Sequence, residues 1–182
     1  MIVQDTYLEE VKVIMPKKIY RDDRGYFFES YKSKNFRENN LPTNFLQENQ
    51  VRSKKNVIRG MHYQLKNPQG KLVKAIEGSI FDVAIDIRIG SPKFGHYVMV
   101  ELSSSNKKML YIPEGFAHGY LVNSNQSLVL YKCTNLYDPE DEHSLLWNDE
   151  DIGIKWNCDS PILSEKDKIA PRLKDQKFLP KL

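Results

Sequence analysis

The stretch Ile80-Phe81-Asp82-Val83-Ala84-Ile85-Asp86-Ile87-Arg88 alternates apolar and polar side chains along most of its length. Successive side chains of a β-strand point to opposite faces of the sheet. One face would therefore carry four apolar side chains, those of Phe81, Val83, Ile85 and Ile87. The other face would carry Asp82, Asp86 and Arg88. This pattern predicts a half-buried strand with one core face and one polar face.

Similar alternation recurs in short stretches, which turn residues separate at positions such as 23–25, 67–70 and 90–92. The further predicted strands are residues 11–14, 26–31, 45–51, 71–76, 97–102, 108–112 and 127–133. A helix is predicted at residues 33–40 with Ser33 as its cap, and a short helix followed by irregular chain is expected from Ser164 onward. So many short strands predict an all-β protein, an antiparallel sandwich or barrel with a few short helices.

The composition indicates one globular domain over residues 1–182, with 40% hydrophobic residues. Lys plus Arg number 27 and Asp plus Glu 24, which leaves +3 without a basic block, so nucleic acid is not an expected partner. No run approaches the roughly 18 apolar residues of a membrane span. The N-terminus lacks the pattern of a signal peptide, and two cysteines make a poor disulfide framework. We therefore expect a cytoplasmic protein with no membrane partner.

Two segments each place a histidine among residues that suit a binding site. The first is Arg59-Gly60-Met61-His62-Tyr63-Gln64, and the second is residues 112–120, where Pro113 and Gly115 form a turn before His118. Taken alone, either histidine can be an ordinary structural residue. Pro113, Gly115 and His118 resemble the second signature of the cupin superfamily, whose members hold ligands inside a small jelly-roll β-barrel.

A metal-binding cupin would also offer a His-x-His pair and a nearby glutamate in its first signature. This chain has His62-Tyr63-Gln64 instead, and His96 and His143 have no ligand spacing to the other histidines. A glycine-rich phosphate loop and a dinucleotide fingerprint are also absent from the sequence. We therefore expect neither a metal nor an organic cofactor.

A closer resemblance is to the dTDP-4-dehydrorhamnose 3,5-epimerase family, and it covers about residues 21–167. Eight matching stretches occur in family order, at residues 23–29, 47–49, 57–64, 69–73, 81–88, 112–119, 131–134 and 163–167. The resemblance implies a cupin-type jelly-roll enzyme that inverts C3 and C5 of dTDP-4-dehydro-6-deoxy-D-glucose through an enolate, in dTDP-L-rhamnose biosynthesis. It also implies a homodimer in which an N-terminal strand, here residues 11–15, joins the partner's sheet.

The resemblance assigns four catalytic residues whose chemistry fits this reaction. His62 would be the base, because an imidazole ordinarily titrates near ~6.5, and Asp167 would orient it. Lys71 would stabilise the enolate oxygen. Tyr131 would protonate the carbon from the opposite face, because a phenol ordinarily keeps its proton up to about pH 10. Without the resemblance, Lys71 would be interpreted as a surface lysine and Tyr131 as a filler of the barrel.

The resemblance also implies which residues hold the substrate, a dTDP-linked 4-keto-6-deoxy sugar. They are Arg24, Glu29, Gln47, Glu48, Asn49, Arg59, Lys71, His118, Glu142 and Lys166. Arginines suit a diphosphate because their forked guanidinium groups make paired hydrogen bonds. Phe27 or Tyr137 would either stack on the base or fill the core. Three alternatives stay open: an epimerase of C3 or C5 alone, a metal-dependent cupin enzyme, and a sugar-nucleotide-binding protein without catalysis.

Overall fold

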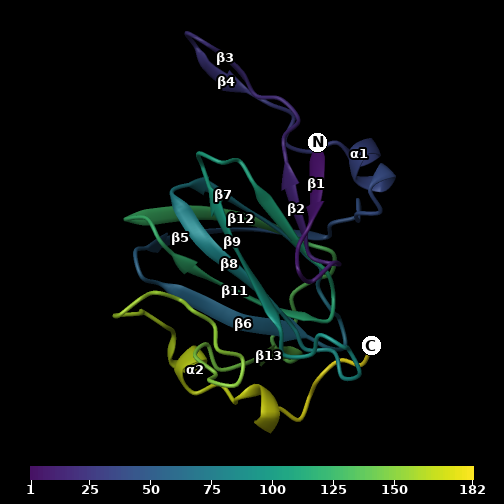
Figure 1. The fold of residues 1–182 in the computed structure, drawn as a ribbon, viewed down its shortest axis with the longest axis vertical. Helices are drawn as coiled ribbons and strands as arrows, with labels where there is room; N and C mark the ends of the chain where they lie inside the picture. Colours follow the sequence, from purple (N-terminus) through teal and green to yellow (C-terminus); the bar gives the residue numbers. More distant parts are fainter.

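The computed structural model describes all residues from Met1 to Leu182. Two antiparallel sheets form a barrel, and a short hairpin projects from one end (Figure 1). The strands are β1 (Ile2–Asp5), β2 (Lys12–Met15), β3 (Tyr20–Asp22), β4 (Gly25–Phe27), β5 (Gln47–Lys54), β6 (Ile58–Gln64), β7 (Lys71–Glu77), β8 (Ser79–Asp86), β9 (Tyr97–Ser103), β10 (Met109–Ile112), β11 (Phe116–Val122), β12 (Gln126–Cys133) and β13 (Glu142–Ser144). The helices are α1 (Ser33–Glu38), α2 (Glu165–Lys168) and the 3₁₀-helix η1 (Leu173–Asp175). None of them is long and apolar enough to cross a membrane.

The two sheets pack face to face around an apolar core. The larger has the strand order β1-β2-β10-β7-β12-β5, and the smaller has the order β13-β6-β11-β8-β9. Val73 and Val129 of the larger sheet pack in one cluster with Ala84 and Phe116 of the smaller sheet. Neighbouring strands often come from distant parts of the chain, as where β12 lies between β7 and β5. The prediction of an all-β, cupin-type jelly-roll barrel is confirmed.

Strand β8 is buried on both faces, so the prediction of a half-buried strand is wrong. Val83 and Ile85 pack in a second apolar cluster, together with residues of the C-terminal part of the chain. Ile80 and Ala84 pack between the sheets. Asp82 shares their face because side chains alternate along a strand, and it is 0% exposed. The face predicted to be polar is therefore an inner wall of the barrel.

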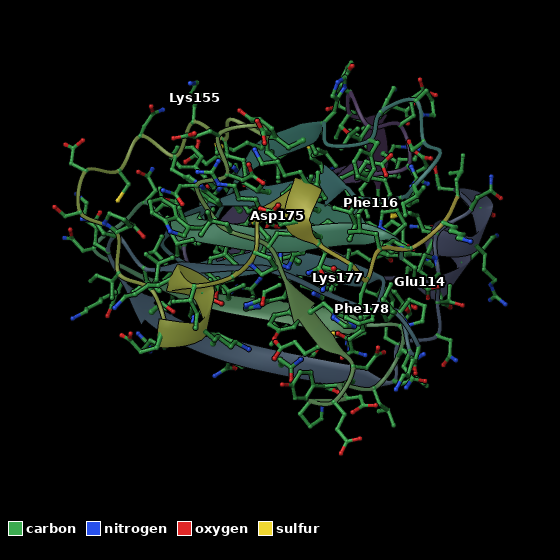
Figure 2. The ribbon with its side chains drawn as sticks, turned by 90° about the horizontal axis from the view of Figure 1, so that it is seen from below. Glu114, Phe116, Lys155, Asp175, Lys177 and Phe178 are labelled. Carbon is green, nitrogen blue, oxygen red and sulfur yellow. The ribbon has the colours of Figure 1, made fainter.

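The C-terminal segment provides the cover over the outer face of the smaller sheet. Figure 2, seen from below, shows Asp175, Lys177 and Phe178 lying along this segment over the strands. Trp156 packs in the apolar cluster there. The carbonyl oxygen of Phe178 accepts a hydrogen bond from the hydroxyl of Tyr63 on β6. The expected form of the tail, one short helix and then largely irregular chain, is confirmed.

Three local predictions differ from the structure. The cap of α1 is Lys32 rather than Ser33, and no side chain bonds to the free backbone N–H groups there. The strand predicted at 26–31 ends at Phe27, where the chain leaves the hairpin. Both edges of β2 are paired within the chain, with β1 and β10, so residues 11–15 are not free to join a partner's sheet.

Candidate active site

A cavity of about 590 Å³ opens into the barrel between the two sheets. This volume suits a small-molecule ligand, because such pockets commonly measure roughly 300–1,000 Å³. The cavity is lined by all four predicted catalytic residues and by six further predicted substrate contacts. They are His62, Lys71, Tyr131, Asp167, Gln47, Asn49, Arg59, His118, Glu142 and Lys166. Both sheets and the segment before α2 contribute to this lining.

His62 on β6 forms a pair with Asp167, which lies 105 residues later in α2. The His62 Nε2 and Asp167 Oδ1 atoms are 2.7 Å apart. Ser164 caps α2 by accepting a hydrogen bond from the backbone N–H of Asp167, which fixes the position of this carboxylate. Burial acts to raise the pKa of Asp167, but the hydrogen bond from His62 and its charge outweigh burial and lower that pKa. The ionised carboxylate can therefore orient the imidazole at neutral pH.

A second histidine–aspartate pair lies beside the first. His118 on β11 is directly opposite His62 on β6. Its Nε2 is 2.6 Å from Oδ1 of Asp82, and both side chains are buried. Burial lowers the pKa of His118, although the Asp82 carboxylate acts to raise it. Sequence reasoning missed Asp82 as a site residue, and the available signal was a carboxylate within a strand whose neighbours are all apolar.

Lys71 is a partly buried cation on the larger sheet, at the start of β7, and it lines the cavity. Burial lowers the pKa of its ammonium group, while Cys133, Asp82 and Glu142 act to raise it. Lys71 forms no hydrogen bond or ion pair with a protein group. The adjacent Cys133 thiol has its pKa raised by burial, so it stays neutral beside the ammonium group. A partly buried cation without a protein partner favours a ligand oxygen that carries negative charge.

Tyr131 on β12 contributes the wall opposite the two histidines. It belongs to the larger sheet, whereas His62 and His118 belong to the smaller sheet. Burial raises the pKa of the Tyr131 phenol, so it keeps its proton at neutral pH and can donate it. The cavity therefore has a potential base on one wall and a potential acid on the other.

The donor groups of this cavity do not fit a metal ion. The Nε2 atoms of His62 and His118 are each bound to a carboxylate, of Asp167 and Asp82 respectively. No group of three or more His, Cys, Asp or Glu side chains is placed to share one ion. A protein-held metal commonly needs three or four such donors around a single point.

Three predicted substrate contacts lie outside the cavity of their own chain. Glu48 points away from it because side chains alternate along β5, and it pairs with Lys132 at 2.7 Å. Arg24 lies in the turn of the β3–β4 hairpin, which projects from the barrel (Figure 1). Its guanidinium pairs with Asp22 at 2.6 Å, and its side chain is 90% exposed. Glu29 follows the hairpin and is also exposed.

The comparisons with known proteins bear on this geometry. A family model described as dTDP-4-dehydrorhamnose 3,5-epimerase matches residues 5–175. The chain belongs to this epimerase family. The dTDP-4-dehydrorhamnose 3,5-epimerase of Salmonella typhimurium is 50% identical over 182 residues, 98% of each chain. The structure of a dTDP-6-deoxy-D-glucose-3,5-epimerase from Legionella pneumophila, in complex with dTDP-4-keto-L-rhamnose, superposes with a TM-score of 0.94 at 44% identity, covering 99% of this chain and 97% of that one.

A structural relative of this epimerase family is described as acting on one carbon. It is a 3′-monoepimerase from Streptomyces bikiniensis, in complex with dTDP-quinovose. Its TM-score is 0.91 at 30% identity, and the match covers 97% of this chain and 92% of that one. The shape of the barrel therefore does not decide by itself how many carbons are inverted.

The mouth of the epimerase cavity carries a polar group centred on Glu142. Its carboxylate accepts hydrogen bonds from the Tyr137 hydroxyl at 3.0 Å and from the Lys166 ammonium at 2.5 Å. The Tyr137 ring is 48% exposed there, and Phe27 on the hairpin is 70% exposed. Neither aromatic ring fills the core, which was one of the two alternatives that the sequence left for them.

Proposed function

We propose that the protein inverts C3 and C5 of dTDP-4-dehydro-6-deoxy-D-glucose by removing and returning a proton at each carbon. The observation that carries this proposal is the placement of His62 and Tyr131 on facing sheets, with one cavity between them. Inversion needs a base on one side of the sugar ring and an acid on the other. A barrel whose two walls come from different sheets provides that arrangement.

The first step is removal of the proton on the carbon next to the C4 ketone. His62 takes this proton, and the electron pair moves to the C4 oxygen to form an enolate. Asp167, 2.7 Å from the His62 Nε2, orients the imidazole and stabilises the imidazolium that forms. This pairing follows the role of the aspartate in a hydrolase triad.

The enolate needs a positive charge that is already in place. Lys71 offers an ammonium group without a protein partner in the cavity lining, where a bound sugar would exclude water that screens its charge. His118 lies beside the base and is held by Asp82. We assign the C4 oxygen to the side of the cavity with Lys71 and His118.

The second step returns a proton from the opposite face. The Tyr131 phenol donates to the carbon, the enolate returns to the ketone, and the configuration is inverted. Repetition at the second carbon completes the reaction. Each inversion moves one proton onto His62 and one proton off Tyr131, so both groups must return to their starting protonation states before the second carbon reacts.

The proposed nucleotide contacts include two cations and an aromatic ring of the cavity lining. Arg59 and Lys166 line the cavity, and two cations suit a diphosphate. Arg59 Nε donates to Ser53 Oγ at 3.1 Å, which leaves its terminal nitrogens for a ligand. Tyr137 offers a half-exposed ring for the base.

Proton NMR in deuterium oxide with chelator present tests this function. The purified protein is mixed with dTDP-4-dehydro-6-deoxy-D-glucose, and deuterium is followed at C3 and C5. Deuterium at both carbons, with inverted configuration, is the expected result. Exchange that requires an added metal ion would favour a metal-dependent cupin. No exchange at either carbon would favour a binding protein without catalysis.

A second candidate is an epimerase of one carbon. The structural similarity to a 3′-monoepimerase favours it, because the whole barrel superposes on a protein of that description. Deuterium at C3 or C5 alone in the same experiment would support this candidate. The two functions share the base and the acid. They differ in whether one or two carbons of the sugar are inverted before release.

We propose that the working form is a homodimer, in which the β3–β4 hairpin of one subunit supplies Arg24 to the cavity of its partner. Arg24 is 90% exposed on a projecting hairpin and lies outside its own cavity. The same hairpin exposes Tyr20, Tyr26 and Phe27, which is unfavourable unless another surface covers them. A closed dimer with two equivalent contacts would bury both hairpins.

Mixing two inactive variants tests the contribution of Arg24 across subunits. Arg24→Ala and His62→Ala proteins are each assayed, then dissociated together and allowed to reassociate. Half of the dimers would be mixed, and each would have one complete site, so about a quarter of wild-type activity should return. If Arg24 serves the cavity of its own chain, mixing restores nothing. A monomer by light scattering would contradict the dimer directly.

We also propose that the protein works in the cytoplasm. Cys133 and Cys158 are both free, and Cys133 is buried beside Lys71. A reducing compartment keeps such thiols unmodified.

Lys71→Arg should change the alkaline side of the pH profile. Because burial lowers the pKa of Lys71, wild-type kcat/KM should fall with rising pH below the ordinary lysine range of about 10.4. Tyr131, whose pKa burial raises, would lose its proton only at higher pH. Arginine stays charged over this range. The variant should therefore have a lower kcat/KM than the wild type at neutral pH, and its kcat/KM should not fall as the pH rises. If kcat/KM of the variant falls with rising pH as in the wild type, the fall must come from a group other than Lys71.

A further inference from the structure

Three buried side-chain atoms in this chain have no hydrogen-bond partner among its own groups. They are Oδ2 of Asp82, the hydroxyl of Tyr120 and the hydroxyl of Ser127. Their residues are 0%, 3% and 0% exposed, in that order. Buried polar atoms in folded proteins are almost always paired, either with protein or with ordered water. Each of these three atoms is therefore a position at which ordered water can complete the hydrogen bonding.

All three side chains lie on strands of the barrel wall. Asp82 on β8 is directly opposite Tyr120 on β11, so their side chains share one face of the smaller sheet. Tyr120 packs in the apolar cluster between the sheets and also lines the cavity, so it lies where the cavity ends and the core begins.

The remaining polar groups of this region connect Tyr120 to the other sheet. Ser127 on β12 is directly opposite Ser53 on β5. Ser53 accepts a hydrogen bond from Arg59, which is paired with Tyr120 across β6 and β11. We call Asp82, Tyr120 and Ser127 the barrel floor. Of the three, Tyr120 lines the cavity and is paired with Asp82, so ordered water at that end of the cavity can reach both polar groups.

The proposed double inversion requires that a proton pass from His62 to Tyr131 between the two inversions. After the first inversion, His62 holds an extra proton and Tyr131 lacks one. The second inversion needs both groups in their starting states. The nucleotide sugar then occupies the cavity and obstructs exchange with bulk water, so an internal route from base to acid would allow two inversions in one encounter.

The contacts place suitable groups along such a route. His62 is directly opposite His118, and facing side chains of paired strands lie about 4.5–5.5 Å apart at Cβ. His118 Nε2 is 2.6 Å from Asp82 Oδ1, and Asp82 is paired with Tyr120. Tyr120 and Tyr131 pack against the same apolar cluster and line the same cavity.

We propose that Asp82 and Tyr120 hold ordered water in the barrel floor, and that this water, together with His118, returns the proton from His62 to Tyr131 between the two inversions. The proposal rests on the proposed function. Each carrier accepts one proton and passes one on, so the only net change is that His62 loses a proton and Tyr131 gains one. No oxidant or other co-reactant is needed, and chains of water and side chains transfer protons in this way.

Tyr120→Phe is the most direct test, because it removes one unpaired hydroxyl and keeps the ring. The protein is mixed with substrate in deuterium oxide and quenched at short times, and singly and doubly inverted sugars are measured by NMR. The wild type should release mainly doubly inverted sugar. The variant should still make the first inversion, but the ratio of second to first inversion should fall at least about tenfold, within the range for lost proton transfer.

Tyr111→Phe is the matched control. Tyr111 is a partly buried tyrosine whose pKa burial raises to about 12, and it lies outside the cavity. Its ratio of second to first inversion should equal that of the wild type. Asp82→Asn provides a second variant, because the amide keeps an acceptor for His118 but cannot carry the proton. It should slow both inversions, because Asp82 also holds His118 beside the C4 oxygen, and it should lower the ratio of second to first inversion as Tyr120→Phe does.

The outcomes separate this proposal from the proposed function. A wild-type ratio in Tyr120→Phe, or an equal loss of both inversions with unchanged thermal stability, would overturn the relay and leave the epimerase intact. A wild type that exchanges neither carbon would overturn the function itself. Excess singly inverted sugar in both variants, with normal thermal unfolding, would support the relay.

Discussion

His62→Ala should lower the turnover of the 4-keto sugar by about 10²–10⁴-fold, the usual loss when a general base is removed. The variant keeps the cavity and its cations, so it should still bind dTDP with nearly wild-type affinity. Deuterium incorporation at C3 and C5 should fall together with turnover, because both carbons use the same base. NMR in deuterium oxide and calorimetry with dTDP measure the two effects separately.

The control for this variant is His96→Ala. His96 lies outside the cavity, and its Nδ1 is 2.9 Å from the Tyr7 hydroxyl. This variant should turn over substrate at the wild-type rate. Near-normal turnover of His62→Ala would contradict the assignment of His62 as the base. The thermal unfolding temperature of His62→Ala must also be measured, because the buried Asp167 loses its partner and the variant could lose activity by unfolding.

Tyr131→Phe should separate removal of the proton from its return. His62 and Asp167 are intact in this variant, so deuterium should still enter the recovered substrate, returned to the face from which the proton left. Formation of inverted product should fall by about 10²–10⁴-fold, because no acid remains on the opposite wall. The measurement is the ratio of deuterated substrate to inverted product.

Two outcomes would contradict the role of Tyr131. Normal inversion would mean that another group donates the proton. Loss of both exchange and inversion would mean that the hydroxyl mainly binds or orients the sugar. Tyr111→Phe is again the control, because it removes a partly buried phenol outside the cavity.

Much of the fold was predictable from local patterns. Stretches such as 71–76 and 127–133 alternate, and β7 and β12 occupy nearly the same residues. The alternation did not reveal what covers each face. Strand β8 is buried on both sides because residues more than 60 positions later pack on its outer face, as Trp156 does.

The site was predictable where a short motif carries its own chemistry. The segments around His62 and His118 were located from the sequence, and the structure places both histidines at the cavity. The roles of Lys71 and Tyr131 came from family resemblance, because an isolated lysine or tyrosine in a strand is uninformative. Asp82 was missed because its partner His118 lies 36 residues away in the chain.

The sequence by itself determined the all-β class, the epimerase family and the segments that carry the proposed site residues. These properties depend on local order: alternation sets which side chains share a face, and motifs set which chemistry is present. Only the tertiary structure decided which groups meet. His62 meets Asp167 across 105 residues, Glu48 points away from the cavity, and Arg24 lies outside it on the projecting hairpin. The physical reason is that strand order, register and the C-terminal cover arise from packing between distant segments, which no local pattern specifies.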